Sequence, residues 1–264
     1  MKKVFAIAAH PDDIEFMMAG TLLMLQRVGY EIHYMNIGSG NCGSTVHDYD
    51  TIKEIRLKEG RKAAEVLGAR FYPPFRDDME IMYDVTTLKH VSAIVRDVKP
   101  NIVLTHSPAD YMEDHTNTCR LAVSAVFARG MRNFSSSPSR PADDYDCVVY
   151  HALPHTLADN LRRAILPGAF VNTAPVFEKK MEALKAHESQ HQWLGLSQKL
   201  NSYLQTMEDL SLKVGGMSKR FAHAEGWRRH LHYGFAESNA DPLRELGDDY
   251  LVDDNYEQGL SSGI

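Results

Sequence analysis

Apolar runs without charge alternate with amphipathic stretches over the first half of the chain. The run at residues 3–8 is apolar after Lys3, which is typical of a strand buried on both faces of a sheet. Residues 15–28 then place apolar side chains at helical spacing and stop before Gly29. The same criteria predict strands at 31–37, 69–72 and 101–105 and helices at 50–67, 83–98 and 116–129. This alternation predicts an α/β fold, a Rossmann-like three-layer sandwich with a mostly parallel sheet.

The pattern is weaker after residue 130. Residues 131–144 are rich in Ser, Pro, Arg and Asp and predict an exposed loop, and residues 147–151 predict another strand. Helical spacing favours helices at 175–192, 198–212 and 221–230. The chain from Gly247 onward is acidic and then rich in Ser and Gly. We therefore expect one domain over residues 1–235, followed by a loosely held C-terminal extension over residues 236–264.

The bulk composition narrows the functional classes. The formal net charge of −6 argues against a broad nucleic-acid-binding surface. No apolar run approaches the ~20 residues of a membrane span, and the N-terminus lacks the apolar core and cleavage site of a signal peptide. Three widely spaced cysteines suit reduced thiols better than a disulfide framework. These features predict a cytoplasmic protein with no membrane span and no nucleic-acid partner.

Two clusters of histidine and aspartate follow predicted strands. The first cluster follows the strand at 3–8 and the second follows the strand at 101–105; their members are His10, Asp12 and Asp13, then Asp110, Asp114 and His115. Open α/β sheets bind ligands at the carboxyl ends of their strands, so neighbouring strands would bring the clusters together.

The residue types in these clusters suit metal-assisted hydrolysis. Two imidazoles and one carboxylate make a three-ligand site for Zn²⁺ with an open position for water, and they suit Fe(II) as well. A further carboxylate could take the proton of that water. The alternative is that each cluster is a solvated loop whose aspartates cap the following helix. Two clusters at matching positions of the sheet favour the metal site.

The same residues carry a resemblance to a known family. The segment His10-Pro11-Asp12-Asp13, with the later Asp110-Tyr111-x-x-Asp114-His115, resembles the motifs of the PIG-L/LmbE family of zinc-dependent de-N-acetylases. Residues 55–68 match the family's Arg-x-x-Glu helix ending in Leu-Gly, residues 180–190 resemble its Lys-x-x-x-Leu-x-x-His-x-Ser-Gln helix, and residues 224–226 resemble an Ala-Glu-Gly element. The resemblance extends in order from about residue 4 to about residue 230.

The resemblance implies an LmbE-like sandwich, a metal site and a substrate class. It implies that His10, Asp13 and His115 are the zinc ligands. The implied activity is the removal of an N-acetyl or other N-acyl group from a small amino-sugar conjugate by water. Relatives in the family often form homo-oligomers, so we expect a homo-oligomer here too.

Three further residues receive roles from the resemblance. Asp12 matches the family's general base, and Asp114 matches the acid that orients a catalytic histidine or a ligand. Arg56 matches an arginine that contacts the substrate or the developing oxyanion. The alternative for Arg56 is an ordinary helical ion pair with Glu59 three residues later.

One position departs from the family pattern. Many members carry a histidine where this chain has Met112, and methionine can neither donate a proton nor stabilise an oxyanion. The candidates for a substitute are His151, His155, His187, His191 and His223. We select His155, with His151 as the second choice, because both follow a predicted strand.

A substitute histidine is one of three possibilities that Met112 leaves open. In the second, zinc, Arg56 and Tyr111 together suffice for catalysis. In the third, the chain is a weak catalyst or acts on a different bond. The alternative functions are therefore a non-catalytic sugar- or nucleotide-binding protein with the same fold, and a zinc amidase that removes another acyl group.

Overall fold

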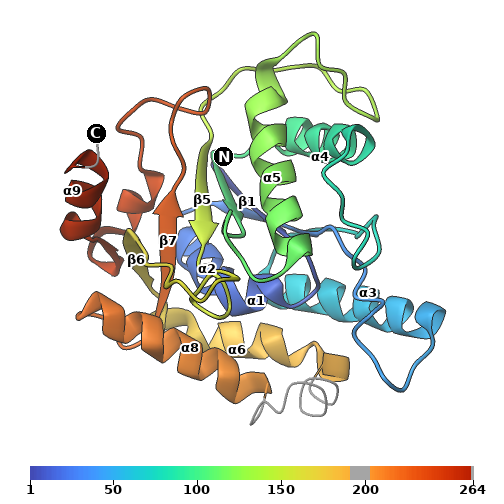
Figure 1. Ribbon diagram of the computed structural model, residues 1–264, viewed down its shortest axis with the longest axis horizontal. Helices are drawn as coiled ribbons and strands as arrows, with labels where there is room; N and C mark the ends of the chain where they lie inside the picture. Colours follow the sequence, from blue (N-terminus) through green and yellow to red (C-terminus); the bar gives the residue numbers. More distant parts are fainter. Residues whose placement is uncertain (191–202, 263–264) are drawn as a thin grey trace.

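The protein is built on one eight-stranded sheet with the strand order β3-β2-β1-β4-β5-β7-β6-β8 (Figure 1). This computed structural model describes residues 1–190 and 203–262. The strands are β1 (Lys3–Ala8), β2 (Glu31–Asn36), β3 (Arg70–Tyr72), β4 (Ile102–Thr105), β5 (Val148–Ala152), β6 (Ala169–Asn172), β7 (Ala224–Arg229) and β8 (Tyr250–Val252). Strands β1 to β5 pair in parallel, whereas β7, β6 and β8 continue the sheet with antiparallel pairs. The mostly parallel α/β sheet is confirmed.

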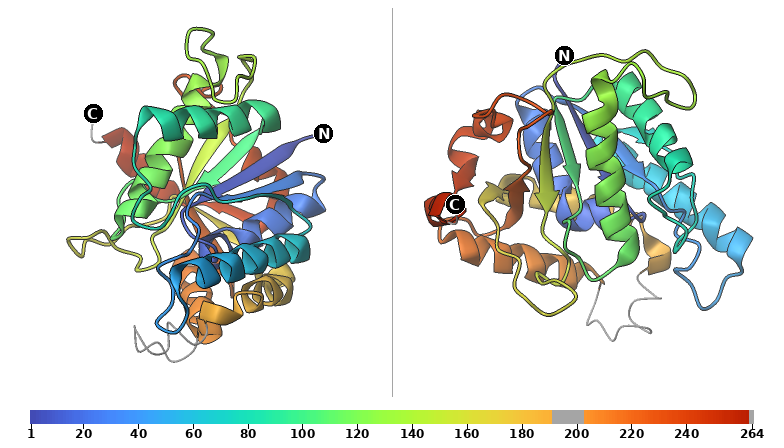
Figure 2. Two further views of the ribbon diagram at one scale, coloured as in Figure 1. Left: turned by 90° about the vertical axis from the view of Figure 1, so that its right-hand side faces the viewer. Right: turned by 45° about the horizontal axis from the view of Figure 1, so that its top comes forward.

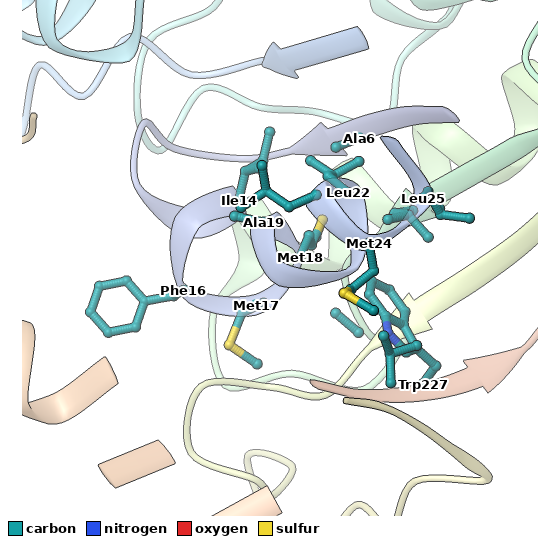
Figure 3. Packing of buried hydrophobic residues seen from close by; sticks show 14 of the residues in the cluster. Ala6, Ile14, Phe16, Met17, Met18, Ala19, Leu22, Met24, Leu25 and Trp227 are labelled. Carbon is teal, nitrogen blue, oxygen red and sulfur yellow. The ribbon is translucent and has the colours of Figure 1, made fainter. Parts of the chain in front are cut away.

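Helices cover both faces of the sheet, as Figures 1 and 2 show. Successive residues of β1 point to opposite sides, so Val4 and Ala6 belong to one apolar core and Phe5 and Ile7 to the other. The first core includes residues of α1 (Asp13–Met17), α2 (Ala19–Arg27), α3 (Tyr49–Leu67), α6 (Phe177–Lys185) and α8 (Tyr203–Ser218). The second core includes residues of α4 (Val85–Val98) and α5 (Glu113–Phe127). Figure 3 shows the first core where α1 and α2 pack beside β1 and Trp227 of β7.

The helix predicted at residues 15–28 is two helices, α1 and α2, with a break at Met18. The carboxylate of Glu225 lies at this break and accepts hydrogen bonds from the backbone N–H groups of Gly20 and Thr21 at 2.8 and 2.7 Å. These N–H groups would be bonded to carbonyls of the preceding turn in one continuous helix. The residue that satisfies them comes from β7, so local sequence pattern could not reveal the break.

The helix predicted at residues 221–230 is wrong, because this segment forms strand β7. Residues 224–227 are all buried between β5 and β6, so the strand shows no alternation of polar and apolar positions. Strand β6 was not predicted. Helices α6 and α8 occupy the regions predicted to be helical, although residues 191–192 and 198–202 of those two predictions lie outside the described residues.

The segment 236–264, expected as a loosely held extension, contributes to the sheet. It contains a 3-10 segment (Pro242–Asp249), the edge strand β8 paired antiparallel with β6, and α9 (Asp254–Ser262). Two shorter 3-10 segments occur earlier, at Ala128–Gly130 and Ala174–Val176. Over residues 1–190 and 203–262, every helix is too short or too polar to cross a bilayer.

Candidate metal centre and active site

The two clusters of histidine and aspartate meet at one edge of the sheet. Strands β1 and β4 are parallel neighbours, with Val4 opposite Ile102, so the loops that follow them leave the sheet side by side. One ligand atom from each of His10, Asp13 and His115 lies within 4.8 Å of the others. This spacing is short enough for the three side chains to bind a single divalent ion.

A carboxylate orients each of the two histidines. His10 donates from Nε2 to Oδ2 of Asp114 at 2.9 Å, while its Nδ1 faces Oδ2 of Asp13 at 3.6 Å. His115 places Nδ1 3.2 Å from Oδ1 of Asp110 and Nε2 3.4 Å from Oδ1 of Asp13. Each imidazole therefore turns one nitrogen to an outer carboxylate and the other to Asp13. Outer carboxylates of this kind fix the tautomer and the ring orientation of histidines that bind metals.

The charges of the metal-free cluster are mutually stabilised. Burial opposes the charged form of His115, but Asp13 and Asp110 outweigh it and raise the pKa of His115 to about 9. Burial likewise opposes the charge of His10, yet hydrogen bonds to Asp114 and Asp13 raise its pKa well above the usual value. The pKa of Asp13 is held well below its usual range despite burial, because His115 and His106 lie beside it. A divalent cation would displace the two histidine protons and take their place against the same carboxylates.

His106 belongs to the cluster, although its sequence position alone did not single it out. Its ring stacks on that of His115 with centroids 4.2 Å apart and planes 11° apart. Its Nε2 accepts a hydrogen bond from the backbone N–H of Ala9 at 2.9 Å, so the proton of the neutral ring is on Nδ1. Burial, reinforced by the charge of His115, lowers the pKa of His106. His106, which follows β4 directly, is thus hydrogen-bonded to the end of β1 and supports one face of the His115 ring.

Asp12 is held by two residues that are distant in sequence. Its Oδ2 accepts a hydrogen bond from the Tyr203 hydroxyl at 2.7 Å and lies 3.3 Å from Nη2 of Arg56. The backbone of Asp12 has φ 109°, in the left-handed region that few residues other than glycine adopt. Arg56 also donates to the carbonyl of Pro11 and lies 3.6 Å from Glu59. Both proposed roles of Arg56 are therefore compatible with the geometry, since it pairs with Glu59 and reaches the site.

A pocket of about 260 Å³ opens over the cluster. The sequence-predicted site residues that line it are His10, Asp12, Asp13, Arg56, Asp114, His115 and His155. A glycine-rich loop at residues 38–45, after β2, contributes Gly40, Cys42 and Gly43. Asp78 secures this loop by accepting hydrogen bonds from the N–H groups of Gly40 and Cys42. All seven predicted residues therefore lie around one cavity.

The candidate substitutes for the missing family histidine have different positions. His155 lines the pocket and its ring lies 4.9 Å from that of Phe16. His151 is buried and does not line the pocket. Its Nδ1 donates to the carbonyl of His106, and its Nε2 pairs with His230. His187 is fully buried 3.3 Å from Glu15.

The remaining two candidates do not change this comparison. His223 stacks on Phe177 with ring centroids 4.1 Å apart, and His191 lies outside the described residues. Of the four candidates that the structure describes, only His155 lines the pocket.

Comparison with known proteins places this site in a family. Residues 5–126 match the family described as PIG-L: GlcNAc-PI de-N-acetylase. A probable N-acetyl-alpha-D-glucosaminyl L-malate deacetylase 2 from Bacillus cereus is 30% identical over 200 residues, which are 72% of this chain and 84% of the relative. The chain belongs to the PIG-L family.

Two further similar proteins are named for different activities, a deacetylase and a hydratase. Diacetylchitobiose deacetylase from Thermococcus kodakarensis is 29% identical over 197 residues, covering 72% of this chain and 70% of that protein. The crystal structure of GalB, the 4-carboxy-2-hydroxymuconate hydratase of Pseudomonas putida, superposes with a TM-score of 0.72 at 23% identity. That match covers 91% of this chain and 99% of the hydratase, and it shows a shared fold.

We expect Asp114→Asn to weaken metal binding by about 10- to 100-fold, the usual cost of losing an outer-shell partner. Asparagine keeps the size of the side chain but loses the charge that faces His10 and the backbone N–H of Met79. Titration of the metal-free protein with Zn²⁺ measures the change. Asp143→Asn is the matched control, because Asp143 pairs with Lys99 and takes no part in the pocket. Unchanged affinity in Asp114→Asn would contradict the orienting role.

Proposed function

We propose that this protein is a metal-dependent hydrolase that removes an N-acyl group from a small amino-sugar conjugate. The observation that carries the proposal is the convergence of His10, Asp13 and His115 beside Asp12 at a pocket. Membership of the PIG-L family and the similarity to two deacetylases of acetylated sugars support the substrate class.

The donor set fits a catalytic divalent metal. Two imidazole nitrogens and one carboxylate oxygen leave a coordination position open, which suits Zn²⁺ and also Fe(II). A metal ion held by these three residues would activate water and polarise the substrate carbonyl.

Asp12 is the general base in this proposal. Tyr203 and Arg56 both contact Oδ2 of Asp12, so we assign the proton transfer to Oδ1. The carboxylate takes a proton from the attacking water and returns it to the departing amine. Arg56 acts mainly by positioning Asp12, since its charge already faces Asp12 and Glu59.

His155 donates a hydrogen bond and does not supply the proton. Burial lowers the pKa of His155, so the imidazole is neutral at pH 7. A neutral imidazole has one N–H that can stabilise the oxygen of the tetrahedral intermediate. We propose that His155 does so in place of the histidine that the family carries at the position of Met112.

The pocket favours a neutral sugar over a polycarboxylate. Among the described residues that line it, Arg56 is the sole lysine or arginine, and it is paired with Asp12 and Glu59. The substrate named for the Pseudomonas hydratase carries a carboxyl group. We therefore favour amide hydrolysis over hydration.

The test is release of acetate from N-acetylglucosamine conjugates by the metal-loaded protein. Removing the metal with a chelator is expected to reduce the rate at least about tenfold, and Zn²⁺ should restore it. His115→Ala should lose stoichiometric metal, whereas His47→Ala, a change at an exposed residue, should retain it. Metal analysis and acetate release are measured on the same samples. A chelated protein with full activity would refute the proposal.

The cytoplasmic location, the homo-oligomer and the division at residue 235 stay predictions. Size-exclusion chromatography with light scattering tests the oligomer directly.

A further inference from the structure

The opening of the pocket carries apolar side chains that solvent reaches. Met79 and Tyr111 line the pocket and are 65% and 44% exposed. Met112, the residue after Tyr111, also lines the pocket and is partly exposed. Single exposed apolar residues are common on protein surfaces, but three of them at the opening of one pocket offer a contact surface for an apolar group. We call these three residues the apolar rim.

The apolar rim is attached to the residues of the metal cluster. The backbone N–H of Met79 donates to Oδ2 of Asp114 at 2.7 Å, and the same oxygen accepts from His10. The ring of Tyr111 meets the ring of His115 edge-on, with centroids 5.7 Å apart. Asp114 and His115 are consecutive residues, so Met79 and Tyr111 lie against the same short segment. A substrate whose amide is at the metal cluster therefore passes the rim on its way to solvent.

The backbone of Met79 indicates a role for its side chain. Met79 has φ 66°, in the left-handed region, and is the third residue of a turn closed by a hydrogen bond from the N–H of Glu80 to the carbonyl of Asp77 at 3.1 Å. Glycine or asparagine is normally preferred at such a position. Methionine suits this backbone poorly, and a side chain that is 65% exposed gains little from burial in the protein. A contact with a ligand accounts for an apolar side chain held in this way.

The charges around the rim favour an uncharged group. Glu80 and Glu113 are exposed and follow Met79 and Met112 directly in the chain. Among the described residues that line the pocket, Arg56 is the sole lysine or arginine, and its charge is already paired. An anionic group at the rim would thus lie near two carboxylates without a free cation, whereas an apolar group would cover exposed apolar surface.

The volume of the pocket places part of a sugar conjugate at the rim. The pocket holds about 260 Å³, below the roughly 300–1,000 Å³ of pockets that enclose a drug-sized ligand. An N-acyl sugar whose amide is at the metal cluster occupies this space. The group attached to the sugar then lies at the opening, where the rim is exposed.

We propose that the substrate is an aryl glycoside of the N-acylated amino sugar and that the apolar rim binds its aromatic ring. An aromatic ring suits the rim because methionine sulfur and tyrosine rings both pack favourably on aromatic rings. This inference rests on the proposed function. The reaction is unchanged: water cleaves the amide C–N bond, and the aromatic ring stays on the amino sugar that is released.

The methyl and phenyl glycosides of N-acetylglucosamine, each as both anomers, test the proposal with the zinc-loaded protein. Covering about 60 Å² of apolar surface is worth roughly tenfold in affinity, so kcat/KM for one phenyl anomer should exceed that for its methyl counterpart about tenfold. The gain should appear in KM, because the rim contacts the substrate and the transition state alike. A 4-carboxyphenyl glycoside should lose most of the gain. Acetate release is measured throughout.

Matched variants locate the effect on the rim. Met79→Gln keeps the length of the side chain but makes it polar, and it should lower the phenyl-to-methyl ratio of kcat/KM at least about threefold. Met82→Gln is the control, because Met82 is in the same loop and 55% exposed but does not line the pocket. Tyr111→Phe should keep the ratio and Tyr111→Asn should lower it. Equal ratios in Met79→Gln and Met82→Gln would overturn the assignment of Met79.

The failures of the two proposals differ. If the methyl glycosides are hydrolysed as fast as the phenyl glycosides, or if the 4-carboxyphenyl glycoside is preferred, the aryl inference falls and the hydrolase proposal stands. If no glycoside is hydrolysed, the proposed function falls. Calorimetry with the Asp12→Asn variant measures binding without turnover. There a phenyl glycoside should bind about tenfold more tightly than its methyl counterpart, and equal affinities would refute the role of the rim.

Discussion

Replacing Asp12 with asparagine is expected to lower kcat about 10³-fold while the protein keeps its metal, because general-base catalysis typically contributes about 10²- to 10⁴-fold. Asparagine has the same shape but cannot take the proton of water. It also tolerates the left-handed backbone conformation that Asp12 adopts, with φ 109°, so the local fold should persist. Hydrolysis rate and metal content are measured on the same preparation.

Tyr203→Phe separates the base from the residue that positions it. This variant keeps the Asp12 carboxylate and its contact with Arg56 but removes the hydrogen bond from the Tyr203 hydroxyl. Its loss of kcat should be smaller, on the order of tenfold, the cost of one charge-assisted hydrogen bond. Asp12→Asn with more than a tenth of the original activity and full metal content would show that another group takes the proton.

The first half of the fold could be predicted because its signals are local and repeated. Strands β1 and β4 are short and mostly apolar, and helices such as α3 end at a glycine, here Gly68. The metal site could be predicted from the sequence for the same reason. His10 and Asp13 lie within four residues, His115 follows a second buried strand, and parallel strands must bring such loops to one edge.

The residues that sequence reasoning missed act through long-range contacts. Tyr203 reaches Asp12 from a helix almost two hundred residues later, and nothing near it in sequence marks it as functional. His106 stood one residue after a predicted strand, a position that could have drawn attention to it. The prediction of a helix at residues 221–230 was wrong because burial on both faces removes the polar–apolar alternation of a strand. Strand β7 is defined by its pairing with β5 and β6, which are distant in sequence.

The motif residues far from the metal have a structural role. Lys180 is 1% exposed, and its ammonium group donates to the Glu225 carboxylate at 2.8 Å and to the carbonyl of Phe16 at 3.0 Å. Glu225 in turn accepts from the backbone of Gly20 and Thr21. One ion pair thus joins α6, β7 and the break between α1 and α2, directly behind the helix that carries Asp13.

Lys180→Met is therefore expected to reduce the free energy of unfolding by about 3–5 kcal/mol, the usual cost of leaving one charge of a buried pair without its partner. Chemical denaturation followed by circular dichroism measures it. Lys185→Met is the control on the same helix, and because Lys185 is exposed its effect should stay within about 0.5 kcal/mol. The double variant Lys180→Met/Glu225→Gln should be more stable than Lys180→Met alone, since it no longer buries an unpaired carboxylate. A loss below about 1 kcal/mol in Lys180→Met would mean that the backbone N–H groups of α2 suffice to stabilise the Glu225 charge.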